Sequence, residues 1–428
     1  MSSTRRAPLI ALVVVTVLAA AAVAAGAQTT TTPASSGNAK EGAEGATTAT
    51  NAPSTAVRGV TPTSIRVAGL GTTGIYGDAQ IGAKARFERT NAEGGVNGRT
   101  ITFQGLTDDG GTADGNKAAA TALIDGEVFA VVPAVAADMA SAYDLVNAQV
   151  PYFGWALSSE FCGNGYGFGF SGCIAARWLT TNIWGRLVKQ SFTSPNPLGN
   201  TAAVLTDNSP AGRYALKAAT AGLEAAGLEI TYARASLPVP PSGDYGAVVK
   251  GVLVSNESKA PRAIFVVGSY SNVAGVQQVL RDASYFGTFT NLVQYDPNLV
   301  AQASGASVFV QTAPTEAAGN TSAMRQLVAD VRKVAPAQPI NQSVIAGYLS
   351  ADLFLAAVKK AGPDLTVGKL IGVANARFTY QLPGVAGPTK FPAGHDRPTP
   401  CGSLVRSNGT SFQIASAYTC GRIVKVPK

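Results

Sequence analysis

Short apolar runs rich in β-branched residues alternate with longer amphipathic stretches along the chain. The predicted strands cover residues 64–70, 100–106, 128–132, 152–155, 202–206, 230–235, 263–267 and 291–294. The predicted helices cover residues 81–91, 116–124, 139–147, 213–226, 245–255 and 273–283. Apolar strands that are each followed by a helix are typical of parallel sheets covered on both faces. The alternation occurs twice with similar spacing, so we expect an α/β protein with two similar lobes.

The first 61 residues do not follow this pattern. Arg5 and Arg6 precede an apolar run over residues 7–25, and small residues follow at Ala25-Gly26-Ala27. This order is that of a cleaved export signal, which we predict over residues 1–27. An uncleaved membrane anchor is the alternative, because the apolar run is nearly long enough to span a bilayer. Residues 28–61, rich in Thr, Ala, Ser and Gly, predict a disordered linker.

Composition agrees with a globular protein of more than one core. The 428 residues are 46% hydrophobic and 14% charged, which is enough apolar material for two or three core units. The formal net charge is +8, but Lys and Arg occur singly, without a block of five or six. We therefore expect no nucleic-acid partner.

The four cysteines favour an oxidising compartment. Cys162 and Cys173 bracket a Gly-rich stretch, and Cys401 and Cys420 bracket a predicted hairpin near the carboxy terminus. An even number of cysteines in an exported chain favours two local disulfides. We expect no metal site, because there is no CxxC pair and His395 is the only histidine.

No catalytic constellation is evident. Residues 69–74 match G-x-G-x-x-G, but the following helix is predicted too late to hold a pyrophosphate, so a glycine-rich rim is the better interpretation. A single histidine and the absence of G-x-S-x-G argue against a Ser-His-Asp triad. Asp108 and Asp109 are adjacent, which favours a turn or cap role over paired catalytic carboxylates. We predict a protein without enzymatic activity and without a cofactor.

The loops after the predicted strands carry the candidate binding residues. Ligands of open parallel sheets bind beyond the carboxyl ends of the strands. Aromatic side chains occur in those loops at Tyr76, Trp155, Tyr270 and Tyr295. Polar side chains occur beside them at Ser158, Ser159, Ser271, Asn272 and Asp296. Aromatic walls with a few hydrogen-bonding groups are what small-ligand sites require.

The run Asn91-Ala92-Glu93-Gly94-Gly95-Val96-Asn97-Gly98-Arg99, followed by Asp108-Asp109, resembles the signature of type I periplasmic binding proteins. More narrowly, it resembles the leucine/isoleucine/valine-binding group that serves ABC importers. The glycine pair suits a helix that ends in a left-handed turn. The resemblance covers residues 63–412 and includes the segments 263–275 and 347–362.

The resemblance implies two Rossmann-like lobes joined by a three-segment hinge, which close around a ligand. Lobe 1 is expected at residues 62–172 and 312–385, and lobe 2 at residues 173–311 and 386–428. The implied protein is an exported monomer, periplasmic or held at the cell envelope, that delivers a small polar, aromatic or amino-acid-like solute to an ABC permease.

The resemblance also implies roles for individual residues. Tyr76 would pack over the ligand, and Tyr270 matches an aromatic of the second lobe. Ala136 falls in the loop that binds a ligand carboxylate, and Ser158 falls near a threonine of the next loop. Asp296 falls near the acidic residue that pairs with a ligand ammonium group.

Two other functions stay open at this point. A sensor module of the same fold would bind a ligand without transport, and an exported α/β enzyme would turn its ligand over. Residues 133–138 contain no Ser or Thr, where binders of free amino acids usually carry them. The ligand is therefore not identified by the sequence.

Overall fold

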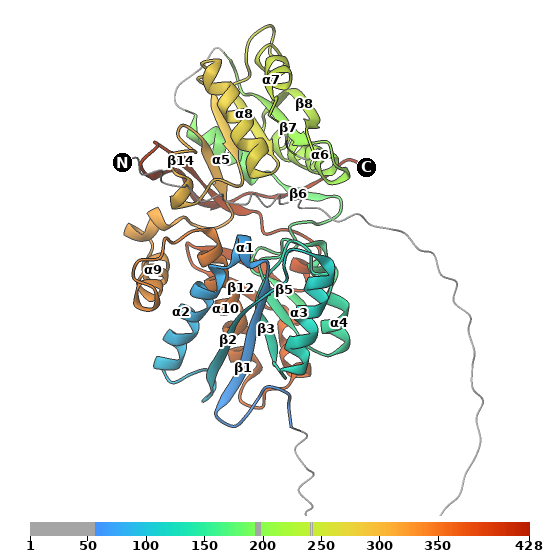
Figure 1. Cartoon of the computed structure of the whole chain (residues 1–428), viewed down its shortest axis with the longest axis vertical. Helices are drawn as coiled ribbons and strands as arrows, with labels where there is room; N and C mark the ends of the chain where they lie inside the picture. Colours follow the sequence, from blue (N-terminus) through green and yellow to red (C-terminus); the bar gives the residue numbers. More distant parts are fainter. Residues whose placement is uncertain (1–55, 193–197, 240, 242) are drawn as a thin grey trace, which may run out of the picture.

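The computed structural model describes residues 56–192, 198–239, 241 and 243–428, which form two lobes (Figure 1). The expected signal peptide and most of the expected linker lie outside these residues. Each lobe is built on its own mainly parallel sheet, so the expected α/β class is confirmed. None of the described helices is both long and apolar enough to cross a membrane.

Lobe 1 contains a five-stranded sheet in which every pairing is parallel. The strand order is β2-β1-β3-β4-β5, with β1 (Ser64–Gly71), β2 (Thr100–Asp108), β3 (Ala130–Val135), β4 (Tyr152–Gly154) and β5 (Gly167–Gly169). Its helices are α1 (Thr73–Tyr76), α2 (Ala79–Ala92), α3 (Ala113–Asp125), α4 (Ala142–Asn147), α9 (Ser322–Val334), α10 (Gln342–Ala361) and α11 (Val367–Asn375).

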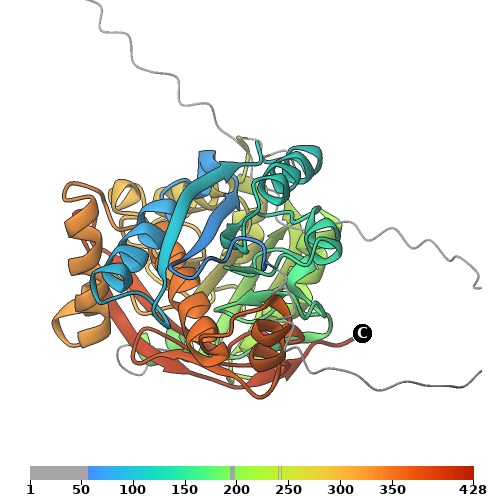
Figure 2. The same ribbon diagram turned by 90° about the horizontal axis from the view of Figure 1, so that it is seen from below.

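Both faces of this sheet are covered, as continuous apolar strands require. Ile65 and Val67 share a core with Phe354 of α10, whereas Leu70 shares a second core with Leu123 of α3. Figure 2 shows α2 and α3 on opposite sides of β1. The sheet is therefore a central layer, and only its strand ends remain free to carry a site.

Lobe 2 contains a seven-stranded sheet of order β15-β14-β11-β10-β9-β7-β8. Its strands are β7 (Thr201–Asp207), β8 (Glu229–Leu237), β9 (Ala263–Val267), β10 (Thr288–Asn291), β11 (Ser307–Val310), β14 (Cys401–Ser407) and β15 (Phe412–Cys420). The strands β7 to β11 pair in parallel, and β14 and β15 add an antiparallel edge. Helices α5 (Ile183–Ser191) and α6 (Pro210–Glu224) pack on one face, and α7 (Gly246–Leu253) and α8 (Tyr270–Asp282) on the other.

The chain passes between the lobes three times. It leaves lobe 1 between β5 and β6 (Leu179–Thr181), returns between β11 and the 3₁₀ turn η3 (Thr315–Gly319), and leaves again before β14. After β15 it ends in β16 (Ile423–Lys425), which pairs antiparallel with β6. The carboxy-terminal segment therefore returns to the first crossing.

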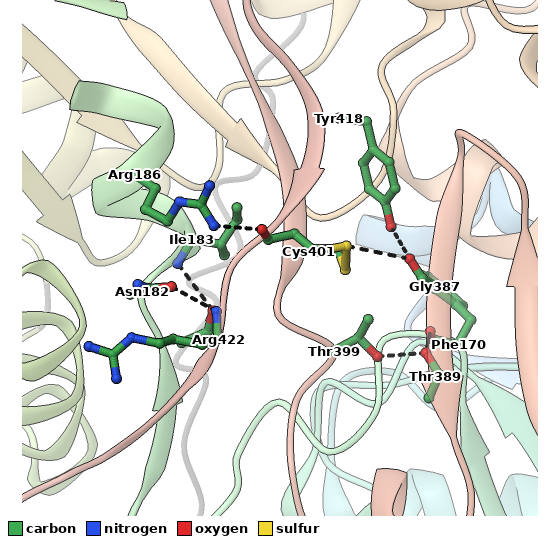
Figure 3. Close-up of a disulfide and its surroundings, with 12 residues drawn as sticks. Phe170, Asn182, Ile183, Arg186, Gly387, Thr389, Thr399, Cys401, Tyr418 and Arg422 are labelled. Carbon is green, nitrogen blue, oxygen red and sulfur yellow. Dashed lines mark hydrogen bonds between the residues drawn. A yellow bond between two sulfur atoms is a disulfide. The ribbon is translucent and has the colours of Figure 1, made fainter. Parts of the chain in front are cut away.

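Both expected disulfides are present, joining Cys162 to Cys173 and Cys401 to Cys420. The second one lies directly across the β14–β15 pair and beside the crossing segments (Figure 3). There the Tyr418 hydroxyl donates to the Gly387 carbonyl oxygen at 2.8 Å. This bond ties β15 of lobe 2 to the hairpin of β12 (Thr379–Leu382) and β13 (Ala386–Lys390).

Three expectations need adjustment. The strand predicted over residues 291–294 is wrong; β10 ends at Asn291, because the Asn291 side chain accepts the backbone N–H groups of Val293 and Gln294 and so forms a turn. The linker expected to reach residue 61 ends earlier, since Val57 and Val60 pack on the lobe-1 core.

The third adjustment concerns residues 386–395, which the expected lobe boundaries assign to lobe 2. β13 pairs with β12, and the ring of Phe391 packs at 5.2 Å against Phe168 of β5. The lobe boundaries stay a prediction, and we propose moving the last one from residue 385 to about residue 396 because of these contacts.

Candidate ligand-binding site

The strand ends of lobe 1 bring three predicted site residues to one edge of the sheet. Gly71 lies opposite Val135, and Ala134 lies opposite Gly154. Tyr76 follows β1, Ala136 follows β3 and Trp155 follows β4. The three segments that carry these residues therefore begin side by side. Ala136 is buried, whereas Tyr76 and Trp155 are half-buried.

Two aspartates hold these loops together. The Asp108 carboxylate accepts the Thr73 N–H at 2.9 Å, and this bond lowers the pKa of Asp108. The buried Asp109 accepts the Gly111 N–H and the Asn116 side-chain amide. Asn116 in turn accepts the Ser141 hydroxyl at 2.7 Å. The carboxylate pair therefore has the turn and cap role predicted from the sequence.

An aromatic row lies at the same edge. The rings of Tyr76 and Trp155 meet edge to face at 6.3 Å, and Trp155 stacks at 6.3 Å on Phe170. Burial raises the pKa of Tyr76 to about 12, with a further contribution from the negative charge of Asp109. The Tyr76 hydroxyl therefore stays protonated at neutral pH and can donate a hydrogen bond.

Trp155 also connects the two lobes. Its indole N–H donates to the Gln311 side-chain oxygen at 2.7 Å. Gln311 directly follows β11 of lobe 2, so a strand end of one sheet faces a strand end of the other. Figure 1 shows the short helix α1 at this junction.

A second interlobe link is made by Asn341, the residue that caps α10. Its side-chain amide donates to Asp78 at 2.8 Å and to Asp296 at 3.3 Å, while its oxygen accepts the Val344 N–H. Asp78 follows α1 in lobe 1, and Asp296 follows β10 in lobe 2. One amide therefore lies between two carboxylates from different lobes.

The other predicted residues lie in separate surroundings. Tyr270 is half-buried at the first position of α8, and among the described residues no ring contact joins it to Tyr76 or Trp155. Ser159 is exposed and donates to Glu160. Ser158 is only 3% exposed, and its hydroxyl has no hydrogen-bond partner among the described residues.

Tyr295 was predicted as an aromatic of the binding loops, but it does not line the junction with Tyr76 and Trp155. It is buried, and its hydroxyl accepts the Thr315 N–H and contacts Glu316 near η3. The reason is that strand β10 ends at Asn291, three residues earlier than predicted. Its neighbour Asp296 is the residue of that loop that contacts Asn341.

The sequence interpretation missed Gln311 and Asn341. Gln311 follows an apolar strand that was not among the predicted ones. Asn341 precedes an apolar helix and could have been identified as a helix cap. Its contacts with Asp78 and Asp296 have no local sequence signal.

Residues 64–411 match the family model described as periplasmic binding protein. This match covers well over half of the chain. The chain belongs to the periplasmic binding protein family. The expectation drawn from the Asn91–Arg99 run is therefore confirmed, and the two-sheet architecture is that of this family. No curated protein matches the sequence of this periplasmic binding protein.

Solved structures of the same fold resemble this periplasmic binding protein at low identity. A solute-binding protein of an ABC transporter from Rhodopseudomonas palustris BisB5, in complex with 3,4-dihydroxybenzoic acid, has a TM-score of 0.62 and 18% identity; 85% of this chain and 99% of that chain are covered.

Two further structures have similar values. A fatty acid ABC transporter substrate-binding protein from Thermomonospora curvata has a TM-score of 0.60 at 18% identity; 85% of this chain and 94% of that chain are covered. A putative branched-chain amino acid ABC transporter from Rhodospirillum rubrum has a TM-score of 0.58 at 19% identity; 82% of this chain and 99% of that chain are covered. Identities this low establish the shared fold.

Proposed function

We propose that this periplasmic binding protein is the exported solute receptor of an ABC importer. The solute would bind between the lobes, stabilise their closure and be passed to a membrane permease. The observation that carries this proposal is the junction at Trp155. There an aromatic row of lobe 1 meets Gln311, which follows a strand of lobe 2.

The side chains at this junction favour a small polar or aromatic solute. Tyr76 and Trp155 offer ring faces and edges, which suit a flat or apolar group. Gln311, Asn341 and Asp296 offer hydrogen bonds from other elements. The buried Ser158 hydroxyl lacks a partner in the described structure, and a polar group of the solute or a water molecule would satisfy it.

Similar structures support this solute class without identifying the solute. The BisB5 protein is in complex with a dihydroxybenzoic acid, and the Thermomonospora curvata protein is named for fatty acids. The sequence around Ala136 has no hydroxyl side chain, so a free amino acid is less well supported than an aromatic or aliphatic acid.

The test uses Tyr76→Ala and Trp155→Ala. Native mass spectrometry of gently purified protein would first identify a copurified solute, and 3,4-dihydroxybenzoate, leucine and a fatty acid form the initial panel. For a solute that binds, we expect each variant to lose about 1–3 kcal/mol of binding free energy by calorimetry.

The matched control is Phe286→Ala. Phe286 is 89% exposed and precedes β10, at the opposite edge of the lobe-2 sheet from the junction. It should leave the affinity unchanged. Equal affinities in the two site variants, the control and the unsubstituted protein would show that the solute does not contact the aromatic row.

A further inference from the structure

The positive charge of the protein is concentrated in lobe 2. Residues 173–311 and 398–428 contain 14 Lys and Arg against seven Asp and Glu, a net charge of +7. Residues 56–172 and 312–397 contain 16 of each, a net charge of zero. Residues 398–428 alone contribute four basic residues and no acidic one. The net positive charge of the described residues therefore lies in lobe 2, which favours anionic partners there.

Six of the lobe-2 basic residues belong to one surface, which we call the lobe-2 basic face. It consists of α6, β6, β16 and their flanking residues, which lie together near the carboxy terminus in Figure 1. The face carries Arg177, Arg213, Lys217, Arg422, Lys425 and Lys428, all exposed. Among the described residues within three positions of these elements, the acidic side chains are Asp207 and Glu224.

Direct contacts hold this face together. β16 pairs with β6, and the Arg422 guanidinium donates to the Ala225 carbonyl oxygen just after α6. The Trp178 ring meets the Tyr214 ring of α6 edge to face at 6.4 Å. The basic side chains are therefore carried by one continuous, structured surface.

Trp178 is presented at the surface of this face. The residue is 42% exposed and has a φ of +62°, which is unusual for a bulky residue. Its N–H donates to the Tyr214 hydroxyl at 2.9 Å, and its carbonyl oxygen accepts the Val426 N–H at 2.8 Å. These bonds fix the backbone on both sides. A groove lies beside the ring, lined by Trp178, Leu179, Lys425, Val426, Pro427 and Lys428.

We propose that the lobe-2 basic face docks on an anionic membrane surface. An exposed tryptophan beside apolar side chains is suited to the headgroup level of a bilayer. Surrounding Lys and Arg side chains are attracted to anionic lipid headgroups. A face made of several elements, with six basic and two acidic side chains, fits an extended anionic surface. This docking does not depend on the proposed solute binding.

The experiment measures partition of the purified protein onto vesicles of phosphatidylglycerol and phosphatidylcholine, with vesicles of phosphatidylcholine alone as reference. We expect binding only to the anionic vesicles, weakened by salt because the contact is electrostatic. The double variant Lys425→Gln with Lys428→Gln should weaken the partition roughly thirtyfold. Each basic residue near the surface contributes about 1 kcal/mol, and a loss of about 1.4 kcal/mol lowers the partition constant about tenfold. Trp178→Ala should weaken it further.

The matched control is Lys250→Gln with Lys259→Gln, which removes the same charge from exposed residues elsewhere on lobe 2. This variant should partition like the unsubstituted protein. Equal weakening of both double variants would mean that net charge alone acts, and would overturn the assigned face. Absence of binding to anionic vesicles at low salt would overturn it as well. Unchanged solute affinity in all variants keeps this test separate from that of the solute site.

Discussion

At the scale of single residues, His395 is a titratable side chain buried in lobe 1. It is 5% exposed, and its ring packs at 5.1 Å against Phe168 and at 4.9 Å against Phe391. Its Nε2 atom lies 2.7 Å from the Asn375 side-chain oxygen. Burial lowers the pKa of His395, opposed by a backbone hydrogen bond to Gly167 and by the charge of Asp396. The folded protein therefore holds this imidazole in its neutral form.

We predict that His395 makes stability fall with decreasing pH. The unfolded chain takes up a proton at about pH 6.5, whereas the folded protein takes it up only at a lower pH. Stability is therefore fully present above about pH 6.5 and is lost as the pH falls towards the folded pKa. His395→Gln should lack this part of the pH dependence in denaturant titrations.

Because the chain has one histidine, the ring resonances in an NMR titration report this pKa without ambiguity. A folded pKa at or above the ordinary value would contradict the prediction, as would identical pH dependence in the variant.

At the scale of elements, the closest helix contact joins α2 and α10 of lobe 1. A Cβ atom added at Gly82 would lie 1.9 Å from the Val344 carbonyl oxygen, and one added at Gly347 would lie 1.8 Å from the Ala79 carbonyl oxygen. Each glycine therefore lets the backbone of the other helix approach directly. Since Asn341 begins α10, this contact also fixes the position of the interlobe amide.

We predict that Gly82→Ala and Gly347→Ala each destabilise the protein by roughly 1–3 kcal/mol, because backbone atoms cannot rotate away from the added methyl group. In an exposed helix the same substitution stabilises by about 0.5–1 kcal/mol. Gly372→Ala in α11 is the control, since an added Cβ atom there meets nothing within 4 Å.

Chemical denaturation of the three variants gives the sign of the change in the free energy of unfolding directly. Stabilisation by all three substitutions would mean that α2 and α10 can separate at little cost, and that their contact does not determine where α10 begins.

At the scale of the whole molecule, side-chain contacts of Trp155 and Asn341 join the facing strand ends of the lobes. Trp155 donates to Gln311, and Asn341 donates to both Asp78 and Asp296. The second contact separates two carboxylates by an amide that donates to both. A neutral donor at residue 341 therefore lets the carboxylates of Asp78 and Asp296 lie close together across the junction.

We predict that Asn341→Asp moves the lobes apart and weakens solute binding. Aspartate caps a helix as well as asparagine does, so α10 keeps its first turn. The new carboxylate cannot donate, and it adds a negative charge next to Asp78 and Asp296. Small-angle scattering should give a larger radius of gyration, and this increase should be smaller at high salt or at low pH.

Asn341→Ser serves as the neutral control, because it keeps a capping oxygen and adds no charge. A scattering profile of Asn341→Asp identical to that of the unsubstituted protein would show that this contact does not set the lobe arrangement.

The sequence by itself determined the class of fold, the family, both disulfide pairings and the strand–helix alternation in the first part of each lobe. It did not predict the strands β5, β6, β11, β12, β13 and β16, or the helices α1, α5, α9 and α11. The predicted features depend on local signals: the apolar period of strands and helices, glycine turns and short cysteine spacings. The same local pattern placed Tyr76 and Trp155 after two strands of one sheet.

The tertiary structure alone decided which strand ends meet. The partners of Trp155 and Asn341 are 156 and up to 263 residues away along the chain. The lobe-2 basic face likewise collects Arg177, Arg213 and Lys425 from separate segments. These contacts follow from how three crossings set two sheets against each other, and such long-range geometry leaves no period or spacing in the sequence.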